Sequence, residues 1–158
     1  MAGESRKGKA AELLVAATCI IESEGKLNAW VSYVDDEGVD LIVQRKDSPR
    51  FVALQVKSRF ATAATITRGQ FITDLRQLTF APRHDFYVLF VVVNHPPARI
   101  ELCWLVPSMD LAARVQPNRR GLYRFAASTG PQATGHWSHY RLAGGDLAAE
   151  LVRVLEMP

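Results

Sequence analysis

An unbroken apolar stretch from Phe86 to Val93 constrains the fold of this chain more than any other segment. It is rich in β-branched and aromatic residues, which strands favour. A strand without alternating polar residues is typical of one that is covered on both faces. The stretch therefore predicts a central strand between two layers of an α/β protein.

The segments around that strand predict further elements. A run rich in Ala and Leu, without Gly or Pro, predicts an opening helix over residues 9–24, whose buried face is expected to hold Leu13, Ala16, Ala17, Ile20 and Ile21. Three strands are expected next, around residues 30–34, 39–44 and 51–57, and others at 100–106, 121–126 and 137–142. A last amphipathic helix is expected from Asp146 onward.

A second helix is predicted between the early strands and the central one. Thr67 and Gln70 have the spacing of a capping box, and Phe71, Leu75 and Leu78 would share one helical face. The order is then helix, three strands, helix, two strands and further elements up to the C-terminal helix. This order predicts an α/β fold with a mixed central sheet, formed by residues 1–158 as a single domain.

Composition narrows the class of partner and compartment. The formal net charge of +3 favours a polyanionic partner, although a soluble surface that is merely basic fits equally well. Cys19 and Cys103 lie in apolar runs without metal-ligand spacing, which suits a reducing cytoplasm. The apolar run at residues 10–21 contains Glu12 and is too short to span a bilayer, so we expect a cytoplasmic protein without a membrane partner.

Polar side chains gather at one end of the expected hairpin. If the turn is centred between Asp47 and Ser48, Asp40 lies opposite Gln55. Lys57 lies two residues further and points to the same face. Charged groups at the edge of a core are costly unless they pair or bind a metal. A partly buried Asp40–Lys57 ion pair with Gln55 as its hydrogen-bond partner and a cation site are both consistent with this pattern.

The same residues resemble a known signature. The segments GVDL at 38–41 and LQVKS at 54–58 are similar to the motif of the PD-(D/E)XK nuclease superfamily, and Glu12 after Lys7, Gly8 and Lys9 resembles the helical acid of archaeal Holliday junction resolvases and restriction-type enzymes. The match covers roughly the first half of the chain. The resemblance implies a restriction-endonuclease-like three-layer α/β/α core around the mixed sheet.

The resemblance also implies roles. Asp40, Gln55, the Val56 carbonyl and Glu12 would hold Mg²⁺ or Mn²⁺, and Lys57 would orient the attacking water or neutralise the phosphate. The expected activity is endonucleolytic hydrolysis of DNA in repair, recombination or defence, with a homodimer as an open alternative. The expected DNA contacts are basic side chains: Lys7, Lys9, Arg59, Arg68 and Arg76. Phe60 would stack on a base or pack in the core.

The chain departs from the family at one ligand position. Gln55 stands where the family usually has Asp or Glu, so the site loses one negative charge. Val39 stands in place of the proline before Asp40. These differences leave open a second interpretation, an inactive nuclease-fold module that binds nucleic acid or a protein partner.

Overall fold

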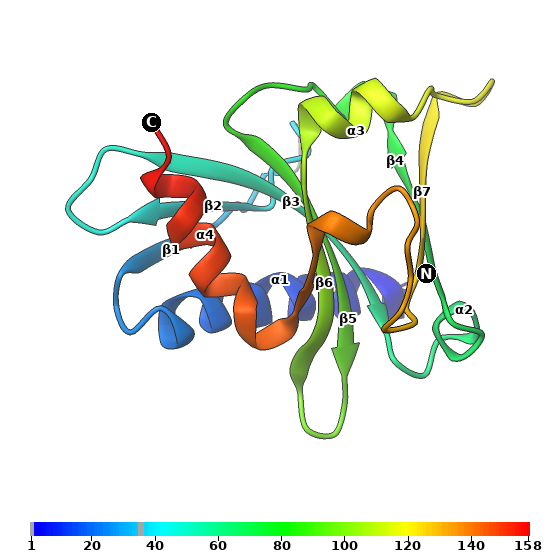
Figure 1. The fold of residues 1–158 in the computed structure, drawn as a ribbon, viewed down its shortest axis with the longest axis horizontal. Helices are drawn as coiled ribbons and strands as arrows, with labels where there is room; N and C mark the ends of the chain where they lie inside the picture. The colour runs from blue at the N-terminus through cyan, green and yellow to red at the C-terminus, as the bar shows by residue number, and fades with distance from the viewer. Residues whose placement is uncertain (1, 35–36) are drawn as a thin grey trace.

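A six-stranded mixed sheet separates two layers of the molecule (Figure 1). The computed structural model describes residues 2–34 and 37–158. The strands lie in the order β1–β2–β3–β5–β6–β8, and their bounds are Leu27–Val31, Leu41–Arg45, Phe51–Phe60, Phe86–Asn94, Arg99–Pro107 and Arg141–Ala143. Only β3 and β5 pair in parallel among these described neighbours. The predicted α/β class with a mixed central sheet is therefore confirmed.

The strand β5 is buried on both faces, as its sequence predicts. Leu89, Val91 and Val93 join one core, and Val88 and Phe90 join the other. The first core is aliphatic and lies under helices, whereas the second contains most of the buried aromatic rings. We call them the helix-side core and the ribbon-side core.

Helices α1 (Ala2–Glu22) and α4 (Leu147–Glu156) cover the helix-side core. The predicted opening helix exists, but its predicted buried face is wrong except for Ala16. The residues Leu13, Ala17, Ile20 and Ile21 face outward, and the helix buries Ala11, Val15, Ala16 and Cys19 instead. Apolar residues lie on both sides of α1, so either side fits against a sheet.

The ribbon-side core is covered by a two-stranded antiparallel ribbon, not by the predicted helix. Its strands are β4 (Gln70–Arg76) and β7 (Leu122–Ser128), and α3 (Ser108–Arg114) packs beside them. Phe71, Thr73 and Leu75 alternate inward, while Leu78 is 96% exposed. A short helix, α2 (Ala64–Thr67), and the left-handed Gly69 precede β4. The helix predicted from Thr67 to Leu78 is therefore wrong.

The remaining elements are short. The predicted strand at 137–142 is a 3-10 turn, η2 (Ser138–Tyr140), followed by β8, and two further 3-10 turns are η1 (Gln77–Thr79) and η3 (Gly144–Asp146). None of the helices that the structure describes is long and apolar enough to cross a membrane.

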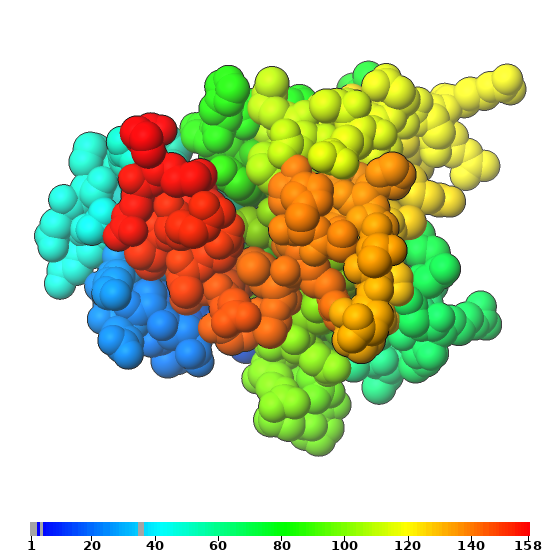
Figure 2. Space-filling model, in the orientation of Figure 1, coloured from blue at the N-terminus to red at the C-terminus, as the bar shows by residue number. Residues whose placement is uncertain are grey.

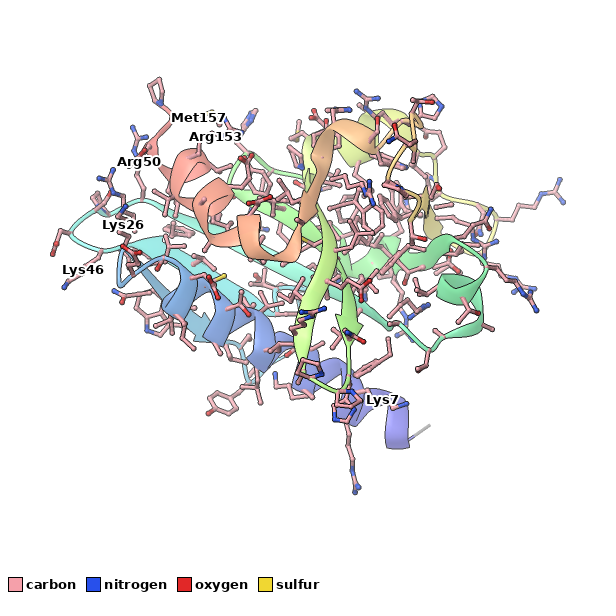
Figure 3. The ribbon with its side chains drawn as sticks, turned by 60° about the horizontal axis from the view of Figure 1, so that its bottom comes forward. Lys7, Lys26, Lys46, Arg50, Arg153 and Met157 are labelled. Atoms are coloured by element: carbon pink, nitrogen blue, oxygen red, sulfur yellow. The ribbon has the colours of Figure 1, made fainter. Side chains whose placement is uncertain are left out.

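The C-terminal helix closes over the turn between β2 and β3. Figure 2 shows α4, in red, against the cyan residues of this turn. Arg50 donates to the carbonyls of Leu155 and Met157, and Figure 3 shows Met157 close to Arg50. Arg45 forms a 3.4 Å ion pair with Glu156. The two Arg50 bonds satisfy carbonyls at the C-terminal end of α4, which lack partners within the helix.

Candidate metal and nucleic-acid site

The predicted hairpin register is confirmed over the length of the ladder. Leu41 pairs with Leu54 and Gln44 with Phe51, so paired residue numbers sum to the predicted value. The ladder ends at Leu41, one pair before the predicted pair of Asp40 and Gln55. Asp40 instead donates its backbone N–H to the Leu54 carbonyl at 2.9 Å.

The carboxylate of Asp40 takes the place of a partner strand at this point. Its Oδ2 accepts the backbone N–H of Val56 at 2.6 Å. A short bond from an N–H to an ionised oxygen is stronger than one between neutral groups. Asp40 is therefore fixed where β2 leaves β3.

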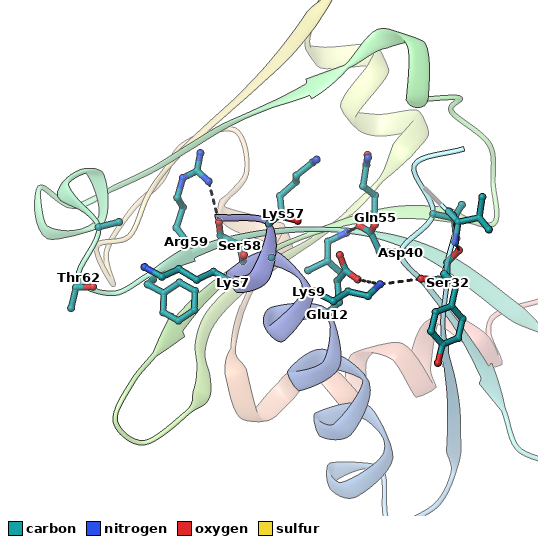
Figure 4. A pocket seen from close by; sticks show the side chains of 18 residues that line it. Lys7, Lys9, Glu12, Ser32, Asp40, Gln55, Lys57, Ser58, Arg59 and Thr62 are labelled. Carbon is teal, nitrogen blue, oxygen red and sulfur yellow. Dashed lines mark hydrogen bonds and ion pairs between the residues drawn. The ribbon is translucent and has the colours of Figure 1, made fainter. Parts of the chain in front are cut away.

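A cavity of ≈ 750 Å³ opens beside this divergence (Figure 4). It lies along the edge of β3 and the N-terminal half of α1. Its lining includes most of the residues that the sequence singled out: Lys7, Lys9, Glu12, Asp40, Gln55, Val56, Lys57, Arg59 and Phe60. Segments that are distant in sequence thus meet at one opening.

The acids and amide reach the cavity from both faces of the sheet. Gln55 and Lys57 share the ribbon-side face with Ala53, whereas Glu12 belongs to α1 on the helix side. Figure 4 shows Gln55 and Lys57 on one side of the strand, Glu12 on the other, and Asp40 between them. These side chains line one cavity because β2 has left this edge of β3.

Gln55 is the most unusual polar residue in the cavity. It is 4% exposed, and its Oε1 has no hydrogen-bond partner among the described residues. A buried acceptor without a donor is unfavourable, by about 1–3 kcal/mol. A cation or a donor from a ligand would satisfy this oxygen.

The ion-pair alternative for the hairpin does not hold. Lys57 forms no ion pair or hydrogen bond within the part of the chain that the structure describes. Its amine lies beside the cavity, in reach of a ligand there. A lysine amine without an ion-pair partner can bind an anion.

Glu12 already has a cationic neighbour. Lys9 Nζ donates to Glu12 Oε2 at 2.7 Å and to the Ser32 carbonyl at 3.0 Å. The Glu12 side chain is 15% exposed and that of Lys9 45%. The predicted DNA contact Lys9 is therefore first a partner of the acid, and this contact ties α1 to the segment after β1. The short spacing of Lys9 and Glu12 on one helix was the available signal, whereas nothing in the sequence pointed to Ser32.

The other predicted basic residues divide into two groups. Lys7 and Arg59 line the cavity, with Lys7 Nζ 5.3 Å from the centre of the Phe60 ring. Arg68 and Arg76 are exposed at the ends of α2 and β4 and do not line it. Phe60 packs partly against the helix-side core, and the Lys7 amine lies over its ring, so packing describes its role better than stacking on a base.

The donor set suits a hard cation. The described residues contain no group of three or more His, Cys, Asp and Glu side chains that would bind a metal by themselves. Two carboxylates, the Gln55 oxygen and a backbone carbonyl are all oxygen donors, which Mg²⁺ and Mn²⁺ prefer with waters completing the shell. Comparison with protein-family models and with curated proteins finds no match for this chain.

Proposed function

We propose that the protein is a metal-dependent endonuclease that hydrolyses DNA phosphodiester bonds, with a PD-(D/E)XK-type site that carries Gln55 in place of the second acid. The observation that carries this proposal is the Asp40 carboxylate, bonded to the Val56 N–H at the point where β2 leaves β3. A cavity opens beside this bond, and Glu12, Gln55 and Lys57 are among the residues that line it. The restriction-endonuclease-like arrangement of the central sheet is part of the same proposal, with the β4–β7 ribbon and α3 where the sequence predicted a second helical layer.

The site residues would have two roles, metal binding and positioning of the phosphate or the attacking water. Asp40, the Gln55 oxygen and the Val56 carbonyl would hold Mg²⁺ or Mn²⁺, and Glu12 would complete the shell directly or through water. The bound metal would act as a Lewis acid at the phosphate. Lys57 would donate to a phosphate oxygen or orient the attacking water, because it lines the cavity and its amine has no partner among the described residues.

The neutral amide at position 55 favours a second candidate, a module that binds nucleic acid or a protein partner without cutting it. An amide oxygen binds a divalent cation less strongly than a carboxylate does. Metal binding and cleavage therefore have to be measured separately.

The test is cleavage of supercoiled plasmid and of labelled single- and double-stranded oligonucleotides with Mg²⁺ or Mn²⁺. Lys57→Ala is expected to abolish cleavage with an unchanged melting temperature. Lys46→Ala, an exposed lysine in the β2–β3 turn, is the matched control and should keep full activity. Equal activity of wild-type protein and Lys57→Ala would show that the cleavage belongs to a contaminant. DNA binding without cleavage or metal binding would select the non-catalytic module.

A further inference from the structure

The backbone N–H groups of β3 point alternately toward β5 and toward the opposite edge, where β2 pairs. Ala53 and Ala61 donate their N–H groups to Asp85 and Val93, so odd-numbered residues bond toward β5. The parallel register with β5 is constant from Ala53 to Phe60, so this alternation persists along the strand. Even-numbered residues therefore direct their N–H groups toward the side that β2 occupies only as far as Leu54.

Two backbone donors on this side remain available at the cavity. The Val56 N–H is bonded to Asp40, but those of Ser58 and Phe60 have no hydrogen-bond partner among the described residues. Both residues line the cavity. Their N–H groups lie about 7 Å apart, the repeat of two residues in a strand.

The carbonyl groups of Ser58 and Phe60 on the same edge are already bonded. The Ser58 carbonyl accepts Arg59 Nη1 at 3.1 Å, and the Phe60 carbonyl accepts the N–H of Ala63 at 2.9 Å. An added polypeptide strand needs both donors and acceptors from the edge that it joins. An edge with open donors and occupied acceptors fits an anion better than it fits a strand.

The charges around this edge agree with an anion. Lys7, Lys57 and Arg59 line this part of the cavity. The acidic lining residues are Glu12 and Asp40, which belong to the candidate metal site. Backbone N–H groups and cationic side chains together are a common way to bind phosphate oxygens.

We propose that the backbone N–H groups of Ser58 and Phe60 bind successive phosphates, beginning next to the scissile one, on a single nucleic-acid strand that runs along β3. This inference rests on the proposed function and adds to it a backbone-phosphate subsite, with Lys7 and Arg59 supplying charge. Contacts to the backbone alone read no base sequence. The subsite therefore fixes the position of the strand without selecting its sequence.

Amide hydrogen exchange of ¹⁵N-labelled protein tests the subsite, because odd and even residues of one strand serve as mutual controls. In the free protein the amides of Ser58 and Phe60 should exchange about 100-fold faster than those of Lys57 and Arg59, which bond to β5. A short oligothymidylate, added in EDTA at low salt so that no cleavage occurs, should slow the even pair about tenfold or more and leave the odd pair unchanged.

A matched pair of variants adds an affinity measurement. Ser58→Pro removes the N–H, which is tolerated where a strand donor faces outward, while Ser58→Ala keeps it. Ser58→Pro should bind the oligothymidylate about fivefold more weakly, and Ser58→Ala should bind like wild-type protein.

Three outcomes would overturn the inference. If the oligothymidylate binds but the amides of Ser58 and Phe60 stay unprotected, the proposed endonuclease survives and the subsite does not. If both amides become protected at rising protein concentration without DNA, a second polypeptide occupies the edge. If no oligothymidylate binds at low salt, where electrostatic binding is strongest, the proposed function and the subsite fail together.

Discussion

Replacement of Gly38 by alanine is expected to damage both the stability of the protein and its candidate metal site. Gly38 has a φ of 69°, a backbone conformation that costs other residues about 1–2 kcal/mol. An added Cβ would lie 2.2 Å from the Thr79 carbonyl oxygen and 3.0 Å from Gln55 Nε2. Relief of that overlap requires backbone movement, at about 1–3 kcal/mol more. The total loss is therefore about 2–5 kcal/mol.

Gly25→Ala is the matched control for this prediction. Gly25 has a φ of 79°, but an added Cβ there would meet nothing within 4 Å. The change in unfolded-chain entropy is the same for both variants, so it cancels in their comparison. Urea unfolding should show a larger loss for Gly38→Ala by about 1–3 kcal/mol, and calorimetry should show weaker Mn²⁺ binding, because Gly38 lies two residues before Asp40. Equal losses in the two variants would refute the close packing of Gly38 on Thr79.

Three further predictions concern single contacts. Lys9→Met should strengthen Mn²⁺ binding by about three- to tenfold, since an ammonium no longer competes for Glu12; weaker binding in calorimetry would mean that Lys9 orients the acid instead. Arg50→Ala removes the bonds to the end of α4 and should lower the melting temperature by about 2–4 °C in a calorimetric scan, whereas an unchanged value would show that this contact contributes nothing. The hydrogen bond from Arg124 lowers the pKa of Asp74 from its usual 3.8. The contribution of this bond to the free energy of unfolding is therefore present above pH 3.8 and is lost as the pH falls through the lowered pKa. The difference in free energy of unfolding between wild-type protein and Asp74→Asn should therefore become smaller as the pH is lowered in urea unfolding experiments. A difference that grows would contradict a stabilising bond between Asp74 and Arg124.

The parts of the fold that the sequence predicted are those with a single possible periodicity. The unbroken apolar run of β5 fits only a doubly covered strand, and the hairpin register follows from its turn. Residues 70–76 fit both a helix and a strand. Phe71 and Leu75 are four positions apart, a spacing that places them on one face of a helix and also on one face of a strand. The partner strand that decides between them, β7, lies far along the chain. The buried side of α1 was undecidable for a similar reason, since apolar residues lie on both sides of it.

The candidate site shows the same division. The period of two places Gln55 and Lys57 on one face, and the turn brings Asp40 near them. The sequence does not show that the ladder stops at Leu41, so it does not show that the Asp40 carboxylate takes up the Val56 N–H. The open donors on β3 also depend on where β2 turns away. The segment around Gly38 lies next to that point, and its close approach to Thr79 has no signal in the local sequence.

The two cores on either side of the sheet differ in the spectroscopic groups that they contain. Cys19 and Cys103 lie in the helix-side core, where burial raises the pKa of both thiols to about 12. Trp104 and Trp137 lie in the ribbon-side core. After Trp30, which is about half exposed, is replaced by phenylalanine, indole fluorescence would report the loss of one layer and thiol labelling the loss of the other. A single unfolding experiment would thus reveal whether the ribbon detaches from the sheet before the helices do.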